Sequence, residues 1–219
     1  MKPLIVFSGI DSAGKSTQID LLRKHYLKNN VRHKVIWSRG GYTNGFELIK
    51  RILRFILRKK LPEPGRNQNR QDMFNKKSVS KIWYIFAMLD LIRLYAFTYR
   101  FYRIMGFTII ADRYLWDTYV DFKMSLGNIN LDKSIFWKIA VKLSPKPQKS
   151  VLLYIGAELS FQRSVDKKEP HFDSLEVRRE RIKFYENLAS LNRWEKFIDT
   201  EKTNVDVTNS LLMEYIYGV

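Results

Sequence analysis

The residues Phe7–Thr17, with the sequence FSGIDSAGKST, restrict the fold of this chain more than any other stretch. Two glycines, a lysine and a serine follow the spacing G-x-x-x-x-G-K-[ST], which is typical of a phosphate-binding P-loop. Such a loop requires a strand before it and a helix after it. The apolar run Leu4–Phe7 predicts the strand, and apolar residues at helical spacing beyond Lys15 predict the helix.

This loop predicts a nucleotide site that uses Mg²⁺ with ATP. The glycines let backbone N–H groups point inward, and the N-terminus of the following helix adds its dipole. We expect Lys15 to reach the β- and γ-phosphates and the hydroxyl of Ser16 to hold Mg²⁺. The predicted ATP-binding residues are Gly9, Ile10, Asp11, Ser12, Ala13, Gly14, Lys15, Ser16 and Thr17.

Length and composition set the class of protein. The 219 residues are 45% hydrophobic, so we expect one α/β domain that spans residues 1–219. The absence of cysteine excludes disulfides and favours a cytoplasmic location. No run of about 18 uncharged apolar residues is present, so no transmembrane segment is predicted.

The chain carries a large positive charge, because 39 basic and 22 acidic residues leave a net +17. Three explanations stay open at this point: a polyanion such as nucleic acid, an anionic membrane, or nucleotide phosphates together with solvated lysines. A membrane could be contacted through residues 46–60, which are typical of a basic amphipathic helix. The polar, proline-containing stretch 59–72 is predicted to be flexible.

Strand and helix patterns alternate along the rest of the chain. This order predicts a parallel five-stranded sheet with helices on both faces, and ligands at the carboxyl ends of the strands. The predicted strands are Leu4–Phe7, Lys34–Ser38, Phe107–Tyr114, Ser150–Ile155 and Glu195–Thr200.

Several of these segments together resemble the thymidylate kinases, a family of P-loop nucleoside monophosphate kinases. The segments are GIDSAGKSTQ, SRGGYT (Ser38–Thr43), ADRY (Ala111–Tyr114), LSFQRSVDKKEPHFD (Leu159–Asp173) and FIDT. The resemblance implies a three-layer P-loop kinase sandwich with a short LID at about 159–173. It also implies a homodimer formed through the long apolar helix predicted at Ser80–Met105.

By this resemblance, catalytic and acceptor-binding roles can be carried over to four residues. Arg39 and Arg113 would clamp the acceptor's phosphate, because guanidinium groups bind phosphate through two hydrogen bonds. Asp112 would order the waters of Mg²⁺ or the acceptor, and Asp11 would position the acceptor or shape the loop. Two alternatives stay open: Arg39 pairs with a surface carboxylate, and Asp112 is satisfied by Lys15 without a metal role.

The LID is expected to supply a cation to the transition state. Some family members carry an arginine inside the P-loop, where this chain has Ser12. We favour Arg163 because its planar guanidinium suits the developing phosphoryl charge, although an exposed basic run is the alternative. Asp173 and Glu176 predict a capping box that begins the next helix. The LID candidates are Arg163, Lys167 and Lys168.

The predicted acceptor pocket departs from the family pattern. Ser8 stands where the family usually has Glu, and two carboxylates, Asp117 and Asp121, follow the Asp-Arg-Tyr motif. Phe86 matches the phenylalanine that stacks on thymine, but Asp90 stands where an arginine is expected. The alternative is that Arg93, almost one turn further along the helix, takes that role in a shifted register. The predicted acceptor-binding residues are Arg39, Phe86, Asp90, Arg93, Arg113 and Asp117.

The sequence therefore predicts transfer of the γ-phosphoryl group of ATP to a phosphate-bearing acceptor, which the resemblance implies is dTMP. One alternative keeps this chemistry and changes the acceptor to another nucleotide, a phosphorylated sugar or a lipid head group. The alternative of another class is a basic module that binds membranes or nucleic acid and retains a relic nucleotide site.

Overall fold

The computed structural model describes residues 1–39, 77–127, 129–168 and 172–218. The chain divides into two compact units. The first unit comprises Met1–Trp37, Phe101–Val120 and Lys146–Val219, and the second comprises Ser38–Arg100 and Asp121–Pro145. The predicted amphipathic helix 46–60, the polar stretch 59–72 and the Gly-Gly turn at 40–41 lie outside the described residues.

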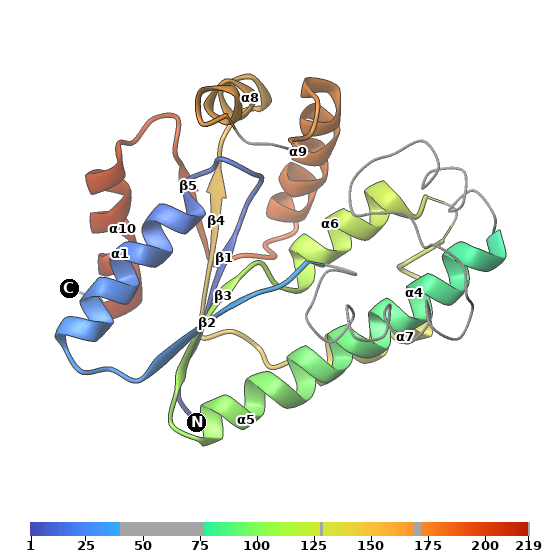
Figure 1. The fold of residues 1–219 in the computed structure, drawn as a ribbon, viewed down its shortest axis with the longest axis horizontal. Helices are drawn as coiled ribbons and strands as arrows, with labels where there is room; N and C mark the ends of the chain where they lie inside the picture. The colour runs from blue at the N-terminus through green and yellow to red at the C-terminus, as the bar shows by residue number, and fades with distance from the viewer. Residues whose placement is uncertain (40–76, 128, 169–171, 219) are drawn as a thin grey trace. The chain divides into compact units, whose positions relative to one another are not determined.

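The first unit contains a sheet of five parallel strands (Figure 1). The strands are β1 (Leu4–Ser8), β2 (His33–Trp37), β3 (Thr108–Asp112), β4 (Lys149–Tyr154) and β5 (Lys196–Asp199). They are arranged in the order β2-β3-β1-β4-β5, which leaves β1 in the centre with every residue buried. The α/β class and the five predicted strands are confirmed, with ends that differ by one or two residues.

Helices flank this sheet in the first unit. Helix α1 (Lys15–Lys28) packs against α10 (Val205–Tyr217), while α8 (Ala157–Asp166) packs against α9 (Leu175–Ser190). Figure 1 shows α1 and α10 on one side of the sheet and α9 on the other. Helix α1 begins at Lys15, as the sequence predicts.

The predicted capping box at Asp173 is wrong by one residue. The N-cap of α9 is Ser174, whose hydroxyl accepts from the backbone N–H of Val177 at 3.5 Å. Asp173 binds two arginines of α9 in place of capping it. Its carboxylate accepts from Arg181 at 3.2 Å, and its backbone carbonyl oxygen accepts from Arg178 at 3.0 Å. The side chain that begins the helix is therefore the neighbouring serine.

A long helix was predicted at Ser80–Met105, and the structure contains it as three consecutive elements. These are α4 (Lys77–Ile92), the π-helical turn η1 (Arg93–Thr98) and α5 (Tyr99–Ile104). Within the second unit, α4 packs on α7 (Ile135–Leu143). One face of α4 is buried, whereas the opposite face exposes Ile82, Ile85 and Leu89.

By length and composition, Ser80–Ile104 is also the one helix within the described residues that could cross a membrane. Half of its apolar window is buried inside the protein. This length and composition are also typical of the core helix of a protein that does not enter a membrane.

Candidate functional site

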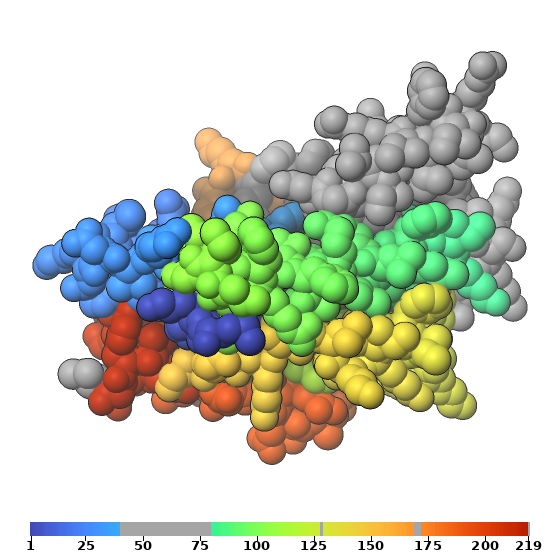
Figure 2. All heavy atoms as spheres, turned by 90° about the horizontal axis from the view of Figure 1, so that it is seen from below, coloured from blue at the N-terminus to red at the C-terminus, as the bar shows by residue number. Residues whose placement is uncertain are grey.

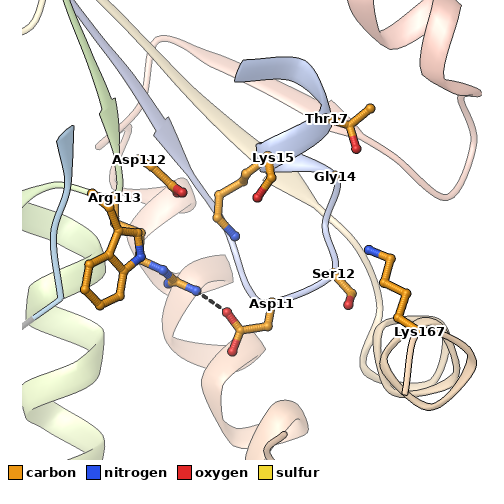
Figure 3. A pocket seen from close by; sticks show the side chains of 10 residues that line it. Asp11, Ser12, Gly14, Lys15, Thr17, Asp112, Arg113 and Lys167 are labelled. Carbon is orange, nitrogen blue, oxygen red and sulfur yellow. Dashed lines mark hydrogen bonds and ion pairs between the residues drawn. The ribbon is translucent and has the colours of Figure 1, made fainter. Parts of the chain in front are cut away.

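A pocket of about 210 Å³ lies at the carboxyl edge of the sheet, within the first unit (Figure 3). The loop after β1, the ends of β2 and β3, and the end of α8 contribute its walls. The lining residues are Asp11, Ser12, Gly14, Lys15, Ser16, Thr17, Trp37, Asp112, Arg113 and Lys167. All of these except Trp37 were predicted as site residues from the sequence.

The loop Gly9–Gly14 has a backbone that depends on its glycines. Gly9 has φ +141°, and a Cβ there would lie 2.3 Å from the carbonyl oxygen of Leu153. Gly14 has φ +87° and precedes the first residue of α1. Ser12 between them also has a positive φ, +60°, a conformation that serine adopts rarely. The loop is thus a tight turn that ends at a helix N-terminus.

Lys15 is buried beneath this loop. Its Nζ donates to the carbonyl oxygens of Gly9 at 3.0 Å and Ile10 at 2.6 Å. Burial and, to a lesser extent, the nearby Arg113 lower the pKa of Lys15 to about 8, even though neighbouring carboxylates oppose the shift. A bound anion would offset the desolvation of this lysine, since the two neutral carbonyls that it contacts only partly replace its hydration.

Asp112 ends β3 beside Lys15 and lines the same pocket (Figure 3). Its Oδ1 is buried and makes no hydrogen bond within the part of the chain that the structure describes. Burial raises the pKa of Asp112, whereas Lys15 and Arg113 oppose that shift. A buried carboxylate oxygen without a hydrogen bond is costly, so this atom is suited to a cation or a bound water.

These residues fit a magnesium ion of the kind that nucleotides bring. Mg²⁺ in such sites usually takes one or two protein oxygens and completes its shell with phosphates and waters. Asp112 and the exposed Ser16 supply oxygens of that kind on the same pocket. Among the described residues no group of three or more His, Cys, Asp or Glu could hold a metal by itself. The protein alone therefore offers a partial shell.

Arg113 follows Asp112 and is buried with φ +73°, a strained backbone for an arginine. Its guanidinium forms an ion pair with Asp11, drawn as the dashed line in Figure 3, and donates to the Tyr185 hydroxyl at 3.3 Å. Asp11 thus forms an ion pair with the arginine that is predicted to bind the acceptor's phosphate. An anion that binds Arg113 would compete with this carboxylate.

Asp117 was predicted to contact the acceptor, but its carboxylate lies inside the first unit and is 1% exposed. It accepts from the Ser8 hydroxyl at 2.5 Å, the Gly9 N–H at 3.2 Å and the Tyr114 N–H at 3.0 Å. The Tyr185 hydroxyl donates to it at 2.6 Å. Asp117, in the first turn of α6 (Leu115–Ser125), therefore supplies a carboxylate next to the position where the resemblance expects Glu in place of Ser8.

The basic residues of the predicted LID are placed differently from one another. Lys167 lines the pocket, directly after the end of α8. Arg163 instead donates to the carbonyl oxygens of Ser12 at 3.4 Å and Thr200 at 3.3 Å. Lys168 is exposed with φ +52° and is not among the lining residues. Of the three, Lys167 is the one whose side chain reaches the pocket.

Sequence reasoning missed a buried arginine behind the loop. Arg178 of α9 donates to the hydroxyls of Ser160 and, at 2.8 Å, Ser164 on α8. Ser160 in turn donates to the carbonyl oxygen of Asp11 at 2.8 Å, and the Ser164 and Ser12 hydroxyls are hydrogen-bonded at 2.9 Å. The one available signal was that Arg178 falls on the buried stripe of α9 with Ile182, Tyr185 and Leu188.

The remaining acceptor candidates belong to the second unit, where they occur as ion pairs. The Arg93 guanidinium donates to Oδ1 of Asp90 at 3.1 and 2.8 Å. Burial raises the pKa of Asp90, and Arg93 opposes that shift. Arg39 lies 3.5 Å from the Asp121 carboxylate, so it pairs with a carboxylate that is buried. Phe86 is half-buried on α4.

The fold and the pocket together define an α/β protein with a glycine-rich loop and a buried lysine at the carboxyl edge of a parallel sheet. A scan against protein-family models and a search of curated proteins each find no match to this chain.

Proposed function

We propose that this chain is an ATP-dependent phosphotransferase of the thymidylate kinase type, built on a three-layer P-loop fold with a short LID at about 159–173. One observation carries the proposal: Lys15 and the unsatisfied Oδ1 of Asp112 lie on one pocket at the N-terminus of α1. A buried cation and a carboxylate oxygen that accepts no hydrogen bond from the described residues, at a helix N-terminus, suit a magnesium–phosphate complex.

The chain's own residues would act by positioning and by neutralising charge. Lys15 would exchange its contacts with Gly9 and Ile10 for the β- and γ-phosphates of ATP. Mg²⁺, when bound beside Ser16 and Asp112, would neutralise negative charge on these phosphates. Lys167 would approach the transferred group from the opposite wall. No general base is required, because the acceptor is already an anion.

Arg113 would bind the phosphate of the acceptor. In the protein without ligand its guanidinium is held by Asp11 and Tyr185, which fixes its orientation before the acceptor arrives. A preoriented arginine loses less conformational entropy when it binds phosphate. The resemblance implies dTMP as that acceptor and a homodimer, and the absence of cysteine favours a cytoplasmic location; these belong to the same proposal.

The acceptor is the less constrained part of this proposal. Asp90 would offer lone pairs where a thymine carbonyl needs a donor, and its salt bridge with Arg93 satisfies one of its oxygens. Another nucleotide, a phosphorylated sugar or a lipid head group that presents amino or hydroxyl donors would suit this carboxylate better. We therefore expect dTMP to be a poorer substrate than such an acceptor.

An ADP-release assay across a panel of acceptors tests the proposal. The panel contains nucleoside monophosphates, phosphorylated sugars and short-chain phospholipids, each with Mg-ATP. We expect acceptor-dependent ADP release that Lys15→Ala lowers about a hundredfold or more, because it removes a charge that contacts the phosphates. Lys24→Ala is the matched control, since this exposed lysine on the same helix lines no part of the pocket.

Two results would contradict the proposal. Turnover that survives Lys15→Ala would remove the lysine from the reaction. Absence of turnover with every acceptor, together with salt-sensitive binding to vesicles or DNA that Lys15→Ala leaves unchanged, would favour the basic binding module.

A further inference from the structure

The edge of the sheet opposite the pocket carries an exposed apolar and basic surface. At the end of α5 and in the turn after it, three apolar side chains extend into solvent: Phe101 is 58% exposed, Ile104 70% and Met105 51%. Three exposed cations, Lys2, Arg32 and Lys34, lie on segments that contact residues 102–107. We call these six residues the amino-edge patch; all belong to the first unit.

Contacts between neighbouring segments hold this patch together. The Arg32 guanidinium lies 4.4 Å from the centre of the Phe107 ring, and Lys34 Nζ lies 4.1 Å from that of Tyr102. The rings of Tyr102 and Phe107 are 6.0 Å apart, and Phe101 lies 5.6 Å from Tyr102. The cations are thereby fixed beside apolar groups, although cations elsewhere on a protein surface are usually surrounded by water.

The N-terminal segment joins the same edge. The guanidinium of Arg103, which is buried, donates to the carbonyl oxygen of Lys2 at 2.5 Å and to Gln148 at 2.9 Å. Figure 2 shows the N-terminal residues in dark blue beside the green segment around residue 100 and the lighter blue segment near residue 30. Three segments that are far apart in sequence therefore form one continuous surface.

The segments that carry the patch, and the strand segment beside them, contain no acidic residue, although Glu195 precedes β5 at the same edge of the sheet. Residues 1–10, 21–37, 101–111 and 146–153 contain lysines and arginines but neither Asp nor Glu. Carboxylates on other parts of the protein do pair with basic residues, as in Arg179–Glu158 and Lys202–Asp199. The positive charge of the patch is thus left without such partners on its own segments, and the net charge of +17 adds to it.

We infer that the amino-edge patch is a docking surface for an anionic membrane, in which Phe101, Ile104 and Met105 enter the interface while Lys2, Arg32 and Lys34 contact lipid phosphates. A peripheral site needs both parts, since one apolar insertion or a few charges alone bind only weakly. This inference does not depend on the proposed kinase activity.

Two other occupants fit the patch less well. A second copy of the chain in a two-fold dimer would place the same cations against each other, and like charges repel. Nucleic acid would match the charge and could stack on Phe101, but the exposed aliphatic side chains of Ile104 and Met105 offer it neither a stacking surface nor a hydrogen bond. Lipid accommodates both the charge and the aliphatic groups.

Docking through this edge has a consequence for the acceptor. The strands run from the edge that carries the patch to the edge that carries the pocket. The patch and the pocket are therefore separated by at least the length of a five-residue strand, about 16 Å. Because the pocket is on the edge that faces away from the bilayer, a lipid head group in the same membrane could not reach it. Under the proposed function, docking through this edge therefore favours a water-soluble acceptor.

Cosedimentation of the full chain with vesicles tests this inference. One set of vesicles is pure phosphatidylcholine, and the other contains about 30% phosphatidylserine. We expect binding to the anionic vesicles only, and we expect it to decrease when salt is raised from about 0.1 to about 0.5 M. Arg32→Gln/Lys34→Gln should weaken binding about thirtyfold, at roughly fivefold for each cation. Phe101→Ser/Ile104→Ser should weaken it at least tenfold without changing the charge.

Matched variants on the rest of the first unit serve as controls. Lys183→Gln/Lys202→Gln removes the same charge from exposed positions, and Val205→Ser/Val207→Ser removes exposed apolar groups outside the patch. Equal losses in patch and control variants, or no binding to anionic vesicles, would overturn the inference. So would binding to a DNA duplex that depends on the patch while vesicle binding does not. A change in molecular mass caused by Phe101→Ser/Ile104→Ser, without any vesicle binding, would assign the patch to a second copy.

Discussion

The pocket of the first unit and the ion pairs of the second unit use the same residue types in different ways. In the first unit, Lys15, Arg113 and Asp112 lie on one cavity, and a carboxylate oxygen of Asp112 has no hydrogen bond among the described residues. In the second unit, Asp90 is neutralised by Arg93, and Arg39 lies next to Asp121. In the first arrangement the charged groups face an open pocket, whereas in the second each arginine faces one carboxylate in an ion pair.

This difference indicates which residues set the specificity for a ligand. Charged groups that face an open pocket are stabilised when a ligand of opposite charge binds. Such residues suit the step that all substrates share, the transfer of the phosphoryl group. An ion pair must break before either of its side chains can bind a ligand. Only a ligand that replaces the lost contact then binds tightly. We therefore expect changes in the first unit to affect every substrate and changes in the second to affect the choice of acceptor.

The largest expected effect comes from Asp117, which ties the glycine-rich loop to α6 and α9. Asp117→Ala leaves four buried donors without their acceptor, and we expect it to lower the free energy of unfolding by about 3 kcal/mol or more. Urea denaturation measures this loss. Asp20→Ala, which removes an exposed carboxylate from α1, should change stability by less than about 0.5 kcal/mol. Similar values for the two variants would show that the network around Asp117 contributes little.

A smaller effect, on the kinetic constants, should distinguish Arg163 in α8 from Lys167 at the end of that helix. Lys167→Ala should lower kcat about tenfold or more with little change in KM for ATP, because its charge would act on the transferred phosphoryl group. Arg163→Ala should raise KM for ATP instead, since this arginine supports the backbone at Ser12 and Thr200. Lys168→Ala is the adjacent control. A larger loss of kcat for Arg163→Ala would return the transition-state role to the arginine.

The pair in the second unit gives a smaller, pH-dependent effect. Arg93→Ala removes a cation that opposes the raised pKa of Asp90, so that pKa rises further. A carboxyl group whose pKa is higher in the folded state stabilises the fold when protonated and loses that contribution as pH rises. We expect a loss of about 1 kcal/mol near pH 7 that shrinks toward pH 4.

Chemical denaturation at several pH values measures the Arg93→Ala effect. Arg23→Ala is the matched control, because it breaks an exposed pair at the same i, i+3 spacing. The control should lose less than about 0.5 kcal/mol at any pH. A loss for Arg93→Ala that does not vary with pH would show that Asp90 is not the group that responds.

The smallest expected effect is a proton taken up by Lys15. Its pKa of about 8 means that roughly half of the free protein carries a neutral lysine near pH 8. Bound phosphates would raise that pKa, so Mg-ADP binding should take up about half a proton near pH 8 and almost none near pH 6.5. Calorimetry in buffers of different ionisation enthalpy measures this uptake, and equal uptake at both pH values would contradict the assignment.

The sequence by itself determined the elements that depend on neighbouring residues. The apolar runs, the glycine spacing and the helical period after Lys15 place four strands, the loop and α1 to within one or two residues, and β3 lies within its longer predicted strand. Because parallel strands share one carboxyl edge, the loop and the Asp112–Arg113 pair could also be assigned to a common site from the sequence.

The tertiary structure decided which side chains are partners. Asp117 contacts Ser8 and Gly9 across more than a hundred residues, and Arg178 reaches Ser12 through a serine of another helix. Lys167 and Arg163 sit one turn apart on or just beyond α8, yet only Lys167 lines the pocket. Such choices depend on how helices pack on the sheet, which local periodicity does not specify. Burial then sets the charge behaviour of Lys15 and Asp112, because desolvation arises only when the chain is folded.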